Sequence, residues 1–402
     1  MHSQLLGMAQ LGNRIRCASF PLYFCKSSSA IASELFVPHQ TLLLEMQAED
    51  NLTAVLYGVG DLRLEQRPIR EPKDDEVLLK IDVVGICGSD LQFVYNGYIG
   101  SLTVDKPVVL GHEVSGTVWK VGRMVKNLKR GNRVAVDPGV ECAKCRYCRE
   151  GRGNLCINSM FAGAAKVDGC LSRFYTHPAN DCYKLPDHVS LEEGAFLELI
   201  SVGIHACKRG GVGFGSVVLI QGSGSLGLVT LLVCRAFGAS KVIMTDYLQS
   251  RLDKAKELGA DLIVQVHPND IAEVVNHRII SALGHHASIC IDCVGTELTM
   301  SLALKVTASG GIIVLVAVGG GPTVKIPITE AVIREIDIRG ARHYINSYSI
   351  ALDMVASGTI DVKPLITHHY RLEEILKALN TSRTREGDAI KVFVHTNRDW
   401  VC

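Results

Sequence analysis

Hydrophobic positions follow two different patterns along this chain of 402 residues. From Leu52 to about Lys129, short apolar runs are separated by turn residues, and examples are Thr53–Tyr57, Glu76–Ile81 and Gly116–Val121. No long amphipathic helix interrupts these runs. Short strands bounded by turns in this way predict an all-β, barrel-like domain.

From about Ser201 the apolar runs become continuous and alternate with helical segments. We expect helices at 226–237 and 251–258, and strands at 217–221, 241–246, 262–266, 288–293 and 312–316. Strands that are apolar throughout are buried on both faces, which predicts a parallel sheet covered by helices.

The last segment, Arg342–His395, is mixed again. It predicts a helix at Leu372–Leu379 and a strand at Ala389–Val394. We therefore expect a catalytic domain made from both ends of the chain, with a nucleotide domain inserted between them. The expected limits are residues 46–200 and 340–402 for the catalytic domain and residues 201–339 for the nucleotide domain.

Residues 1–45 differ in composition from the rest of the chain. Arg14 and Arg16 precede the first acidic residue, Glu34, and serine is frequent. This composition is typical of an organelle transit segment. The alternative is an unfolded extension, with Met46 as the start of the protein, and we favour that alternative. We expect a cytoplasmic protein, and a mitochondrial one only if residues 1–45 act as a transit segment.

Charge and hydropathy exclude two classes of partner. Lys and Arg number 42 against 41 Asp and Glu, so the chain lacks the basic field that grips a nucleic-acid backbone. No apolar run approaches the ~18 residues that a membrane-spanning helix needs. We therefore expect neither a nucleic-acid partner nor insertion into a membrane.

Four of the fourteen cysteines form a tight cluster. Their spacing is Cys142-x2-Cys145-x2-Cys148-x7-Cys156. Four thiolates close a tetrahedral shell around one zinc ion and leave no open position, so the spacing predicts a structural zinc site. The alternative, four free thiols on a polar surface loop, would be prone to oxidation with no compensating role.

A second, open metal site is predicted in the β-rich part of the chain. Cys87 lies in the glycine-rich turn GICGSD, and His112 and Glu113 follow Gly111. One thiolate, one imidazole and a carboxylate suit zinc. Each element is weak alone, because a single histidine is more often a structural residue than a ligand.

The sequence Gly222-Ser-Gly224-Ser-Leu-Gly227 follows a predicted strand and opens a predicted helix. This context is typical of a dinucleotide-binding turn, in which the helix N-terminus stabilises the pyrophosphate. Asp246 ends the next strand, where a carboxylate binds the ribose hydroxyls and repels a 2′-phosphate, so NAD is favoured over NADP. Arg251 lies a few residues further on, within reach of the adenine. The alternative is an ordinary glycine turn followed by a carboxylate at a strand end.

Taken together, these residues resemble a known family. The motifs VGICGSDLQ, VVLGHEVSGTV, SVGIHACKRGG and VKPLITHH, together with the cysteine lobe, resemble the zinc-containing medium-chain dehydrogenases, and within them the sorbitol dehydrogenases. The resemblance runs from about Leu52 to His395. It implies an α/β protein with a GroES-like β-rich catalytic domain and a Rossmann domain, whose doubly wound parallel sheet binds NAD. Most such enzymes are homotetramers and some are dimers.

The resemblance also implies residue roles. Cys87, His112 and Glu113 would be the catalytic zinc ligands, with Glu198 reaching the metal directly or through water. Ser89 would lie in the proton path, and Asp90 would support the ligands. The implied substrate contacts are Phe93, Phe161, Glu198, His343 and Tyr344. The implied NAD contacts are Gly222, Gly224, Leu226, Gly227, Asp246, Arg251, Val316, Ala317, Val318, Ala341, Arg342 and His343.

The implied reaction is the reversible oxidation of a polyol such as sorbitol to a ketose such as fructose. Departures from the family pattern are concentrated in the polyol shell: Phe93 replaces a usual Tyr, Leu199 a usual Pro, and His343 a usual Arg. These changes keep two alternatives open, namely a dehydrogenase for another secondary alcohol and a divergent paralogue that binds zinc and NAD with weak turnover. The intact zinc ligands argue against the second alternative.

Overall fold

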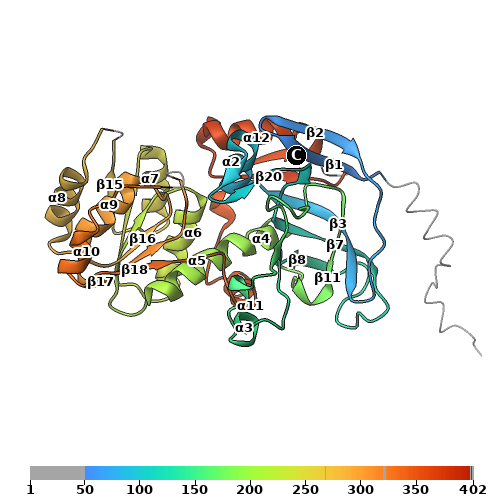
Figure 1. The fold of residues 1–402 in the computed structure, drawn as a ribbon, viewed down its shortest axis with the longest axis horizontal. Helices are drawn as coiled ribbons and strands as arrows, with labels where there is room; N and C mark the ends of the chain where they lie inside the picture. The colour runs from blue at the N-terminus through green and yellow to red at the C-terminus, as the bar shows by residue number, and fades with distance from the viewer. Residues whose placement is uncertain (1–49, 268, 320–322, 399, 401–402) are drawn as a thin grey trace, which may run out of the picture. The chain divides into compact units, whose positions relative to one another are not determined.

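The computed structural model describes residues 50–267, 269–319, 323–398 and 400, all within one compact unit that begins at Asp50. The predictions for residues 1–45 lie outside the described residues. Figure 1 shows a β-rich part, in which β1, β3 and β7 lie, and a parallel sheet flanked by helices.

One large sheet forms the frame of the β-rich part. Its strands run in the order β12-β8-β7-β3-β20-β19 among the described residues, and β11 also pairs with β3. They are β3 (Glu76–Gly85), β7 (Glu113–Val121), β8 (Arg133–Val136), β11 (Phe174–Pro178), β12 (Cys182–Lys184), β19 (Ile366–Arg371) and β20 (Lys391–His395). Smaller sheets hold β1 (Leu52–Gly58), β2 (Asp61–Gln66), β4 (Tyr98–Ile99), β5 (Leu102–Thr103), β6 (Val108–Val109), β9 (Gly139–Val140) and β10 (Met160–Phe161).

The three strands predicted near the start of this part are confirmed, as they fall within β1, β3 and β7. A helix that the apolar pattern did not predict, α2 (Gly88–Asn96), follows β3. It has only 9 residues and ends at Gly97, whose φ of 78° is a left-handed value that favours glycine. A helix this short buries only part of one face, so its periodicity in the sequence is weak.

The second part is a parallel sheet with strand order β15-β14-β13-β16-β17-β18 among the described residues. This order is that of a doubly wound dinucleotide-binding sheet. The strands are β13 (Val217–Gln221), β14 (Lys241–Asp246), β15 (Leu262–Gln265), β16 (Ala287–Asp292), β17 (Thr307–Leu315) and β18 (Asp337–Gly340). The predicted strands are all present, and the predicted helices correspond to α6 (Ser225–Ala236) and α7 (Gln249–Glu257).

Both faces of this sheet are buried. Val218 and Ile220 of β13 pack into one hydrophobic core, and Leu219 between them packs into another. The first core includes residues of α5 (Leu197–Gly210), α6 and α7, and the second includes residues of α8 (Ala272–Leu283) and α9 (Glu297–Val306). The uninterrupted apolar run in β13 therefore reflects helices on both sides of the sheet.

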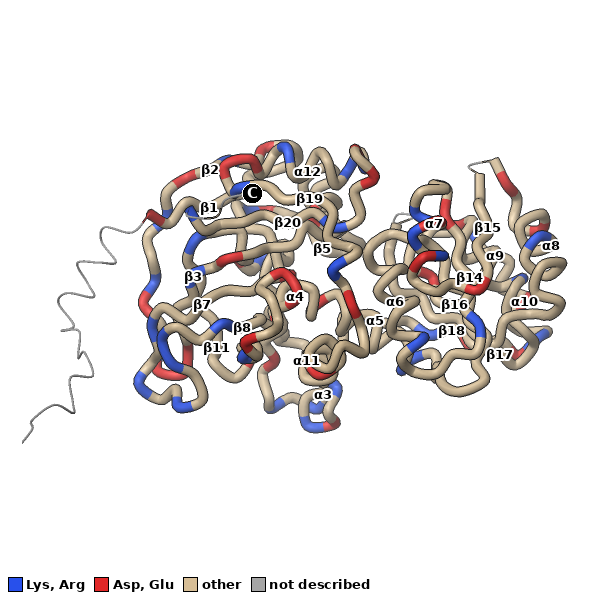
Figure 2. Tube along the Cα trace, turned by 180° about the vertical axis from the view of Figure 1, so that it is seen from behind, with Lys and Arg blue, Asp and Glu red and all other residues tan. Residues whose placement is uncertain are grey.

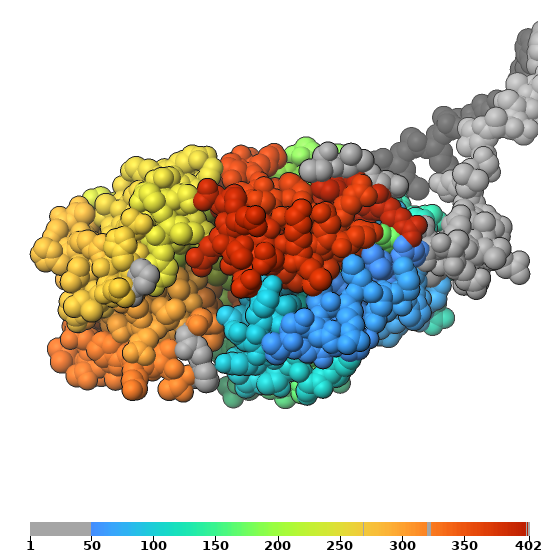
Figure 3. Space-filling model, turned by 90° about the horizontal axis from the view of Figure 1, so that it is seen from above, coloured from blue at the N-terminus to red at the C-terminus, as the bar shows by residue number. Residues whose placement is uncertain are grey.

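The C-terminal segment returns to the β-rich part. Strand β20 pairs antiparallel with β3 and parallel with β19, and α12 (Ile375–Thr384) connects β19 to β20. Figure 3 shows this segment, in red, packed beside the blue residues from the start of the described chain. The remaining helices are α3 (Arg146–Arg149), α4 (Leu191–Ala195), α10 (Thr329–Ile333) and α11 (Tyr348–Ala356), with short 3-10 turns η1 (Gly153–Leu155), η2 (Ala179–Asp181), η3 (Lys363–Leu365), η4 (Leu372–Glu374) and η5 (Glu386–Asp388).

Helix α5 joins the two parts and runs through residue 201, where the sequence pattern changes. Most of its residues are buried. Helix α5 carries Glu198 near its N-terminus and ends at Gly210, whose backbone lies beside Ile289 and Val314 of the parallel sheet, so one rigid element connects the two parts.

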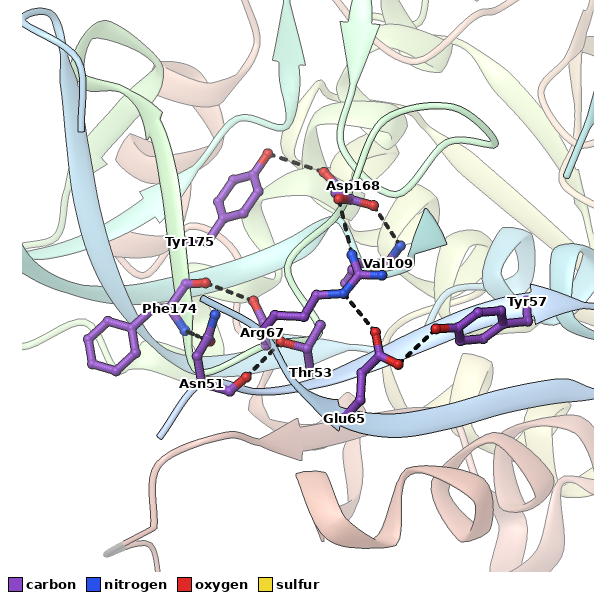
Figure 4. A network of polar contacts seen from close by, with 10 residues as sticks. Asn51, Thr53, Tyr57, Glu65, Arg67, Val109, Asp168, Phe174 and Tyr175 are labelled. Carbon is purple, nitrogen blue, oxygen red and sulfur yellow. Dashed lines mark hydrogen bonds and ion pairs between the residues drawn. The ribbon is translucent and has the colours of Figure 1, made fainter. Parts of the chain in front are cut away.

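A network of polar contacts fixes the loop that leads to His112 (Figure 4). Asp168 accepts a hydrogen bond from the amide of Val109 at 3.0 Å and forms an ion pair with Arg67 at 3.4 Å. The Glu65 carboxylate accepts a hydrogen bond from Arg67 Nε at 2.9 Å and another from the Tyr57 hydroxyl at 2.8 Å. The network ties β6 to β1 and β2, three residues before His112.

Acidic and basic residues are interspersed along the described chain, as Figure 2 shows. Over the same residues, no helix combines the length and the apolar character needed to cross a membrane.

Candidate functional site

A cavity of about 730 Å³ is lined by residues of both parts of the fold. Its walls include the turn at Cys87, the loop at His112, the start of α5 and the glycine turn after β13. The structure therefore brings the predicted open metal site and the predicted dinucleotide turn to one space.

The N-terminus of α2 positions Cys87. The Asp90 carboxylate accepts a hydrogen bond from the Cys87 amide at 3.0 Å and another from the Gly111 amide at 3.2 Å. Asp90 is fully buried, so it joins the cysteine turn to the loop that carries His112. Gly111 has φ of 91°, and a side chain there would meet Val84 and Leu171 at 2.9 Å. The loop therefore requires glycine at this position.

His112 is held between two side chains. Its Nδ1 lies 3.7 Å from Asp90, and its Nε2 lies 3.3 Å from the Ser89 hydroxyl. The ring is buried, with 6% of the residue exposed. The predicted proton-path residue thus lies beside the nitrogen of a predicted metal ligand.

Glu113 begins β7 and is completely buried. One carboxylate oxygen contacts Lys391 Nζ of β20 at 2.5 Å, whereas the other oxygen has no hydrogen-bond partner among the described residues. Gly85 leaves room for this carboxylate, since a Cβ there would lie 2.2 Å from Glu113 Oε2. The unpartnered oxygen is the kind of atom that a metal ion satisfies.

Cys87, His112 and Glu113 lie close enough to share an ion, because their ligand atoms are all within 4.8 Å of one another. Burial, with the nearby Glu113 and Asp90 charges, raises the pKa of the Cys87 thiol to about 12. Burial also raises the pKa of Glu198 well above its usual range, and Glu113 and Cys87 add to this effect. A divalent cation would stabilise the thiolate and these carboxylates together, so the donor set fits zinc.

Aromatic rings form the wall of the cavity beside the predicted metal ligand His112. Phe161 stacks on His343 with ring centroids 4.0 Å apart and lies 5.6 Å from the His112 ring. Phe93 of α2 and Leu199 of α5 also line the cavity. Tyr344 does not line this cavity; its hydroxyl donates to Asp137 at 3.2 Å, and its ring borders a smaller pocket nearby.

The predicted dinucleotide residues gather at the other end of the cavity. Gly222 has φ of 89°, and a Cβ on Gly227 would lie 1.8 Å from the Gly222 carbonyl oxygen, so both glycines are required by close packing. Asp246 accepts hydrogen bonds from the amides of Ser223 at 2.7 Å and Leu248 at 2.9 Å. The other predicted NAD contacts on the cavity wall are Gly224, Leu226, Arg251, Val316, Ala317, Val318, Ala341, Arg342 and His343.

This end of the cavity fits a dinucleotide. Helix α6 begins directly after Gly224, so its unpaired amides face the glycine turn. The buried Ser223 hydroxyl has no hydrogen-bond partner among the described residues. Arg251 donates to the carbonyl of Ala389 at 3.0 Å, which ties α7 to the C-terminal segment.

The four clustered cysteines surround one point on a separate lobe. All four sulfur atoms lie within 4.8 Å of one another. Backbone amides lower the pKa of Cys142 to about 6, whereas burial and the neighbouring thiols raise the pKa of Cys148. Of the cysteines from Cys170 onward, five are buried in the described part of the chain, namely Cys170, Cys182, Cys207, Cys234 and Cys290.

Sequence reasoning missed several residues of the site. Lys391 reaches Glu113 from 278 positions along the chain, and Ser382 and Arg385 line the cavity from the C-terminal segment. No local motif marks these residues. A signal exists only for Lys391, as a single charged residue that opens the apolar strand KVFV.

The chain is similar to known dehydrogenases, which agrees with a site for zinc and a dinucleotide. Residues 73–187 match the protein family described as the alcohol dehydrogenase GroES-like domain. Residues 225–357 match the family described as zinc-binding dehydrogenase. Sorbitol dehydrogenases from Bos taurus and Homo sapiens are each 47% identical over 345 residues, which cover 86% of this chain and 96% of each relative.

Solved structures are similar as well. L-idonate 5-dehydrogenase from Escherichia coli is 27% identical with a TM-score of 0.79, and the match covers 87% of this chain and 99% of that one. The 2R,3R-butanediol dehydrogenase from Bacillus subtilis is 27% identical with a TM-score of 0.77, over 86% of this chain and 100% of that one.

The fold and site define a zinc-containing medium-chain dehydrogenase, with a GroES-like domain and a doubly wound nucleotide domain. Within this class, the chain belongs to the sorbitol dehydrogenase family. It is therefore an oxidoreductase that uses zinc and NAD, as the sequence predicted.

Proposed function

We propose that this enzyme transfers hydride from a secondary alcohol of a polyol to NAD, in a reaction of the sorbitol-to-fructose type. The observation that supports this proposal is the shared cavity, in which the group Cys87, His112 and Glu113 faces the same space as the dinucleotide turn. Relatives named sorbitol dehydrogenase and 47% identical to the chain support the choice of substrate class.

Cys87, His112 and Glu113 would hold the catalytic zinc, with Glu198 on the neighbouring wall. When bound, zinc acidifies the substrate hydroxyl as a Lewis acid, and NAD supplies the carbon that accepts the hydride. The chain's own residues hold these groups in place and keep bulk water out. Lys391 offsets part of the negative charge of the ligand set through its contact with Glu113.

Ser89 is the residue that we assign to the proton path. Its hydroxyl is half-buried and lies 3.3 Å from His112 Nε2, at the edge of the cavity. A hydroxyl both donates and accepts, so Ser89 can take the alcohol proton and pass it toward solvent. Phe161 and His343 form the stacked wall that orients the substrate chain.

Asp246 and the glycine turn select the coenzyme. The Asp246 carboxylate already accepts two backbone amides and retains lone pairs for the ribose hydroxyls. Its negative charge disfavours a 2′-phosphate. Val316–Val318 and Ala341–His343 border the cavity where the nicotinamide would lie.

A second candidate function is oxidation of a less hydroxylated secondary alcohol. Burial, with the neighbouring Arg342 charge, lowers the pKa of His343 to about 4, so this residue is neutral where an Arg is usual. Phe93 and Leu199 also present no polar atom to the cavity. When a polyol hydroxyl finds no hydrogen-bond partner in the site, the preference for a polyol over a simpler alcohol weakens by a few kcal/mol, on the order of 10²-fold in rate.

The wider organisation belongs to the same proposal. The catalytic domain comprises residues 46–200 and 340–402, the NAD-binding domain comprises residues 201–339, and Cys142, Cys145, Cys148 and Cys156 bind a structural zinc. We expect a homotetramer or a dimer in the cytoplasm, or in mitochondria if residues 1–45 direct import. Sedimentation of the purified protein and imaging of chains that start at Met1 and at Met46 test these two points.

Activity with a substrate panel tests the function. Purified protein is assayed with zinc, NAD and each of sorbitol, xylitol, ribitol and simple secondary alcohols, with NADH absorbance as the readout. Polyol oxidation that Cys87→Ser abolishes supports the proposal. Oxidation of simple alcohols alone supports the second candidate, and NAD binding without turnover contradicts both.

A further inference from the structure

A third group of metal-ligating side chains lies outside the active site and outside the cysteine lobe. It consists of Glu192 in the first turn of α4, His369 on β19 and His395 at the end of β20. One ligand atom from each residue lies within 4.8 Å of the other two. Neither the zinc chemistry of the active site nor NAD binding uses these residues.

The two histidines already face each other through ring nitrogens. His369 Nδ1 and His395 Nε2 are 2.9 Å apart, and their ring centroids are 5.1 Å apart. Two nitrogens that bind one ion at the usual ~2.1 Å are about 3.0 Å apart at a right angle and about 3.4 Å apart in a tetrahedron. The observed separation is therefore close to that of two ligands of one ion.

The surroundings hold these rings in place. His395 is 2% exposed, on a strand that pairs with both β3 and β19. The ring of Trp400 stacks on His395 with centroids 3.9 Å apart and planes 6° apart, and it also stacks on His369 at 6.0 Å. Arg371 donates to the Trp400 carbonyl at 2.9 Å, which keeps the indole over both rings.

The charges at this place favour a cation. His369 Nδ1 and His395 Nε2 share one proton in the hydrogen bond between them, and transfer of that proton to the other nitrogen of its ring would leave both lone pairs facing the same point. The Glu192 side chain makes no hydrogen bond or ion pair with the described residues, although its charge raises the pKa of nearby Asp82. A carboxylate close to two neutral imidazoles provides a ligand set with one negative charge.

We propose that Glu192, His369 and His395 bind a divalent cation of the zinc class, as a third metal site in this protein. Two imidazoles and one carboxylate suit Zn²⁺, and the half-buried Glu192 and His369 leave an open side for water. The ion would join α4 to the parallel pair of strands β19 and β20. It has no thiolate ligand, which separates it chemically from the other two sites.

Zinc content after equilibrium dialysis tests the site. The full-length protein is stripped with a chelator, dialysed against Zn²⁺ and analysed by mass spectrometry of the metal. We expect His369→Gln to hold one zinc per chain fewer than the unmodified protein. The matched control is His368→Gln, because adjacent strand residues point to opposite faces of the sheet, and it should hold the full amount.

A second variant and a spectroscopic readout guard against misfolding. Glu192→Gln keeps the size of the Glu192 side chain, which makes no hydrogen bond with the described residues that the change could break. It should lower the zinc affinity of the third site at least tenfold and leave the circular dichroism spectrum unchanged. In the Co²⁺ form, His369→Gln should lose the part of the visible ligand-field absorption that the third site contributes. It should keep all of the thiolate-to-cobalt charge-transfer absorption, because the third site has no thiolate ligand. Dehydrogenase activity should persist in both variants, so failure of this site is distinguishable from failure of the proposed function.

Three results would overturn the proposal. They are equal zinc content in the unmodified protein and His369→Gln, loss of the same equivalent in His368→Gln, and unchanged zinc affinity in Glu192→Gln. Any of these results would mean that zinc beyond the two other predicted sites is bound adventitiously by surface histidines.

Discussion

Lys391 Nζ lies 2.5 Å from one carboxylate oxygen of Glu113, and both side chains are shielded from solvent. The ammonium also donates to the carbonyl of Ile86 at 3.2 Å, in the turn just before Cys87. Lys391, from the C-terminal strand, therefore fixes the orientation of Glu113, a proposed zinc ligand, and leaves the other Glu113 oxygen without a hydrogen-bond partner among the described residues. The C-terminal segment thus contacts the proposed metal centre.

Replacement of Lys391 by methionine should destabilise the metal-free protein strongly. The change keeps the length of the side chain but leaves the buried Glu113 carboxylate without its counter-charge, and removal of one partner of a buried pair costs about 3–5 kcal/mol. Urea unfolding of the metal-free Lys391→Met variant measures this loss. The double variant Lys391→Met/Glu113→Gln should recover most of it, and equal destabilisation of single and double variants would show that the pair is unimportant.

Asp90→Asn should weaken the catalytic zinc site. The asparagine keeps the shape of the side chain but turns one of its two acceptors into a donor, opposite the amides of Cys87 and Gly111. Loss of a residue that supports metal ligands typically reduces metal affinity 10–100-fold. Titration with a competing chelator measures the change. The matched control is Asp361→Asn, which alters an exposed carboxylate that accepts a hydrogen bond from the Lys363 amide at 3.0 Å, and it should leave the affinity within threefold.

Asp246→Ala should change the coenzyme preference. The carboxylate that repels a 2′-phosphate and binds the ribose is removed, so the ratio of kcat/KM for NAD to that for NADP should fall at least tenfold, or about 1.4 kcal/mol. Steady-state kinetics with both coenzymes give the ratio. Asp253→Ala, on the exposed side of the next helix, is the control. A ratio unchanged by Asp246→Ala would refute the role assigned to this carboxylate.

The pH dependence of stability should report buried neutral histidines. His177 is 2% exposed, and burial lowers its pKa from 6.5 to about 4. The unfolded chain therefore binds an extra proton between these values, so the free energy of unfolding falls as pH decreases from about 6.5 to about 4, by roughly 3 kcal/mol for one such group.

Urea unfolding between pH 7 and pH 4 measures this slope. His177→Gln removes the titrating group and should make the slope shallower, whereas His267→Gln, at an exposed position, should leave it unchanged. A steeper or identical slope in His177→Gln would contradict the assignment of His177 as a buried neutral ring.

The sequence was sufficient for the parts of the fold that repeat a local rule. Continuous apolar runs such as Val217–Gln221 reveal strands buried on both faces, and the glycines at 222 and 227 are explained by the close contacts that a side chain there would make. Spacing alone predicted the cysteine lobe, because all four cysteines fall within fifteen residues. Each of these features can be predicted from the sequence because its residues lie within one short stretch of the chain.

Features that depend on distant parts of the chain were not predictable in this way. The contact of Lys391 with Glu113 and the group Glu192, His369 and His395 arise because β20 joins the sheet between β3 and β19. Helix α2 was missed because its nine residues bury only Asp90, Phe93 and Val94. Tyr344, assigned to the substrate by resemblance, has its hydroxyl on Asp137 outside the main cavity.

The most direct test of the account is transfer of deuterium from C2-deuterated sorbitol to NAD, followed by mass spectrometry of the reduced coenzyme. Because one ion held by Cys87, His112 and Glu113 must face the nicotinamide, the unmodified protein with zinc should form deuterated NADH, and Cys87→Ser should form none above background. Equal transfer by Cys87→Ser, or reduced coenzyme that carries no deuterium, would contradict the account.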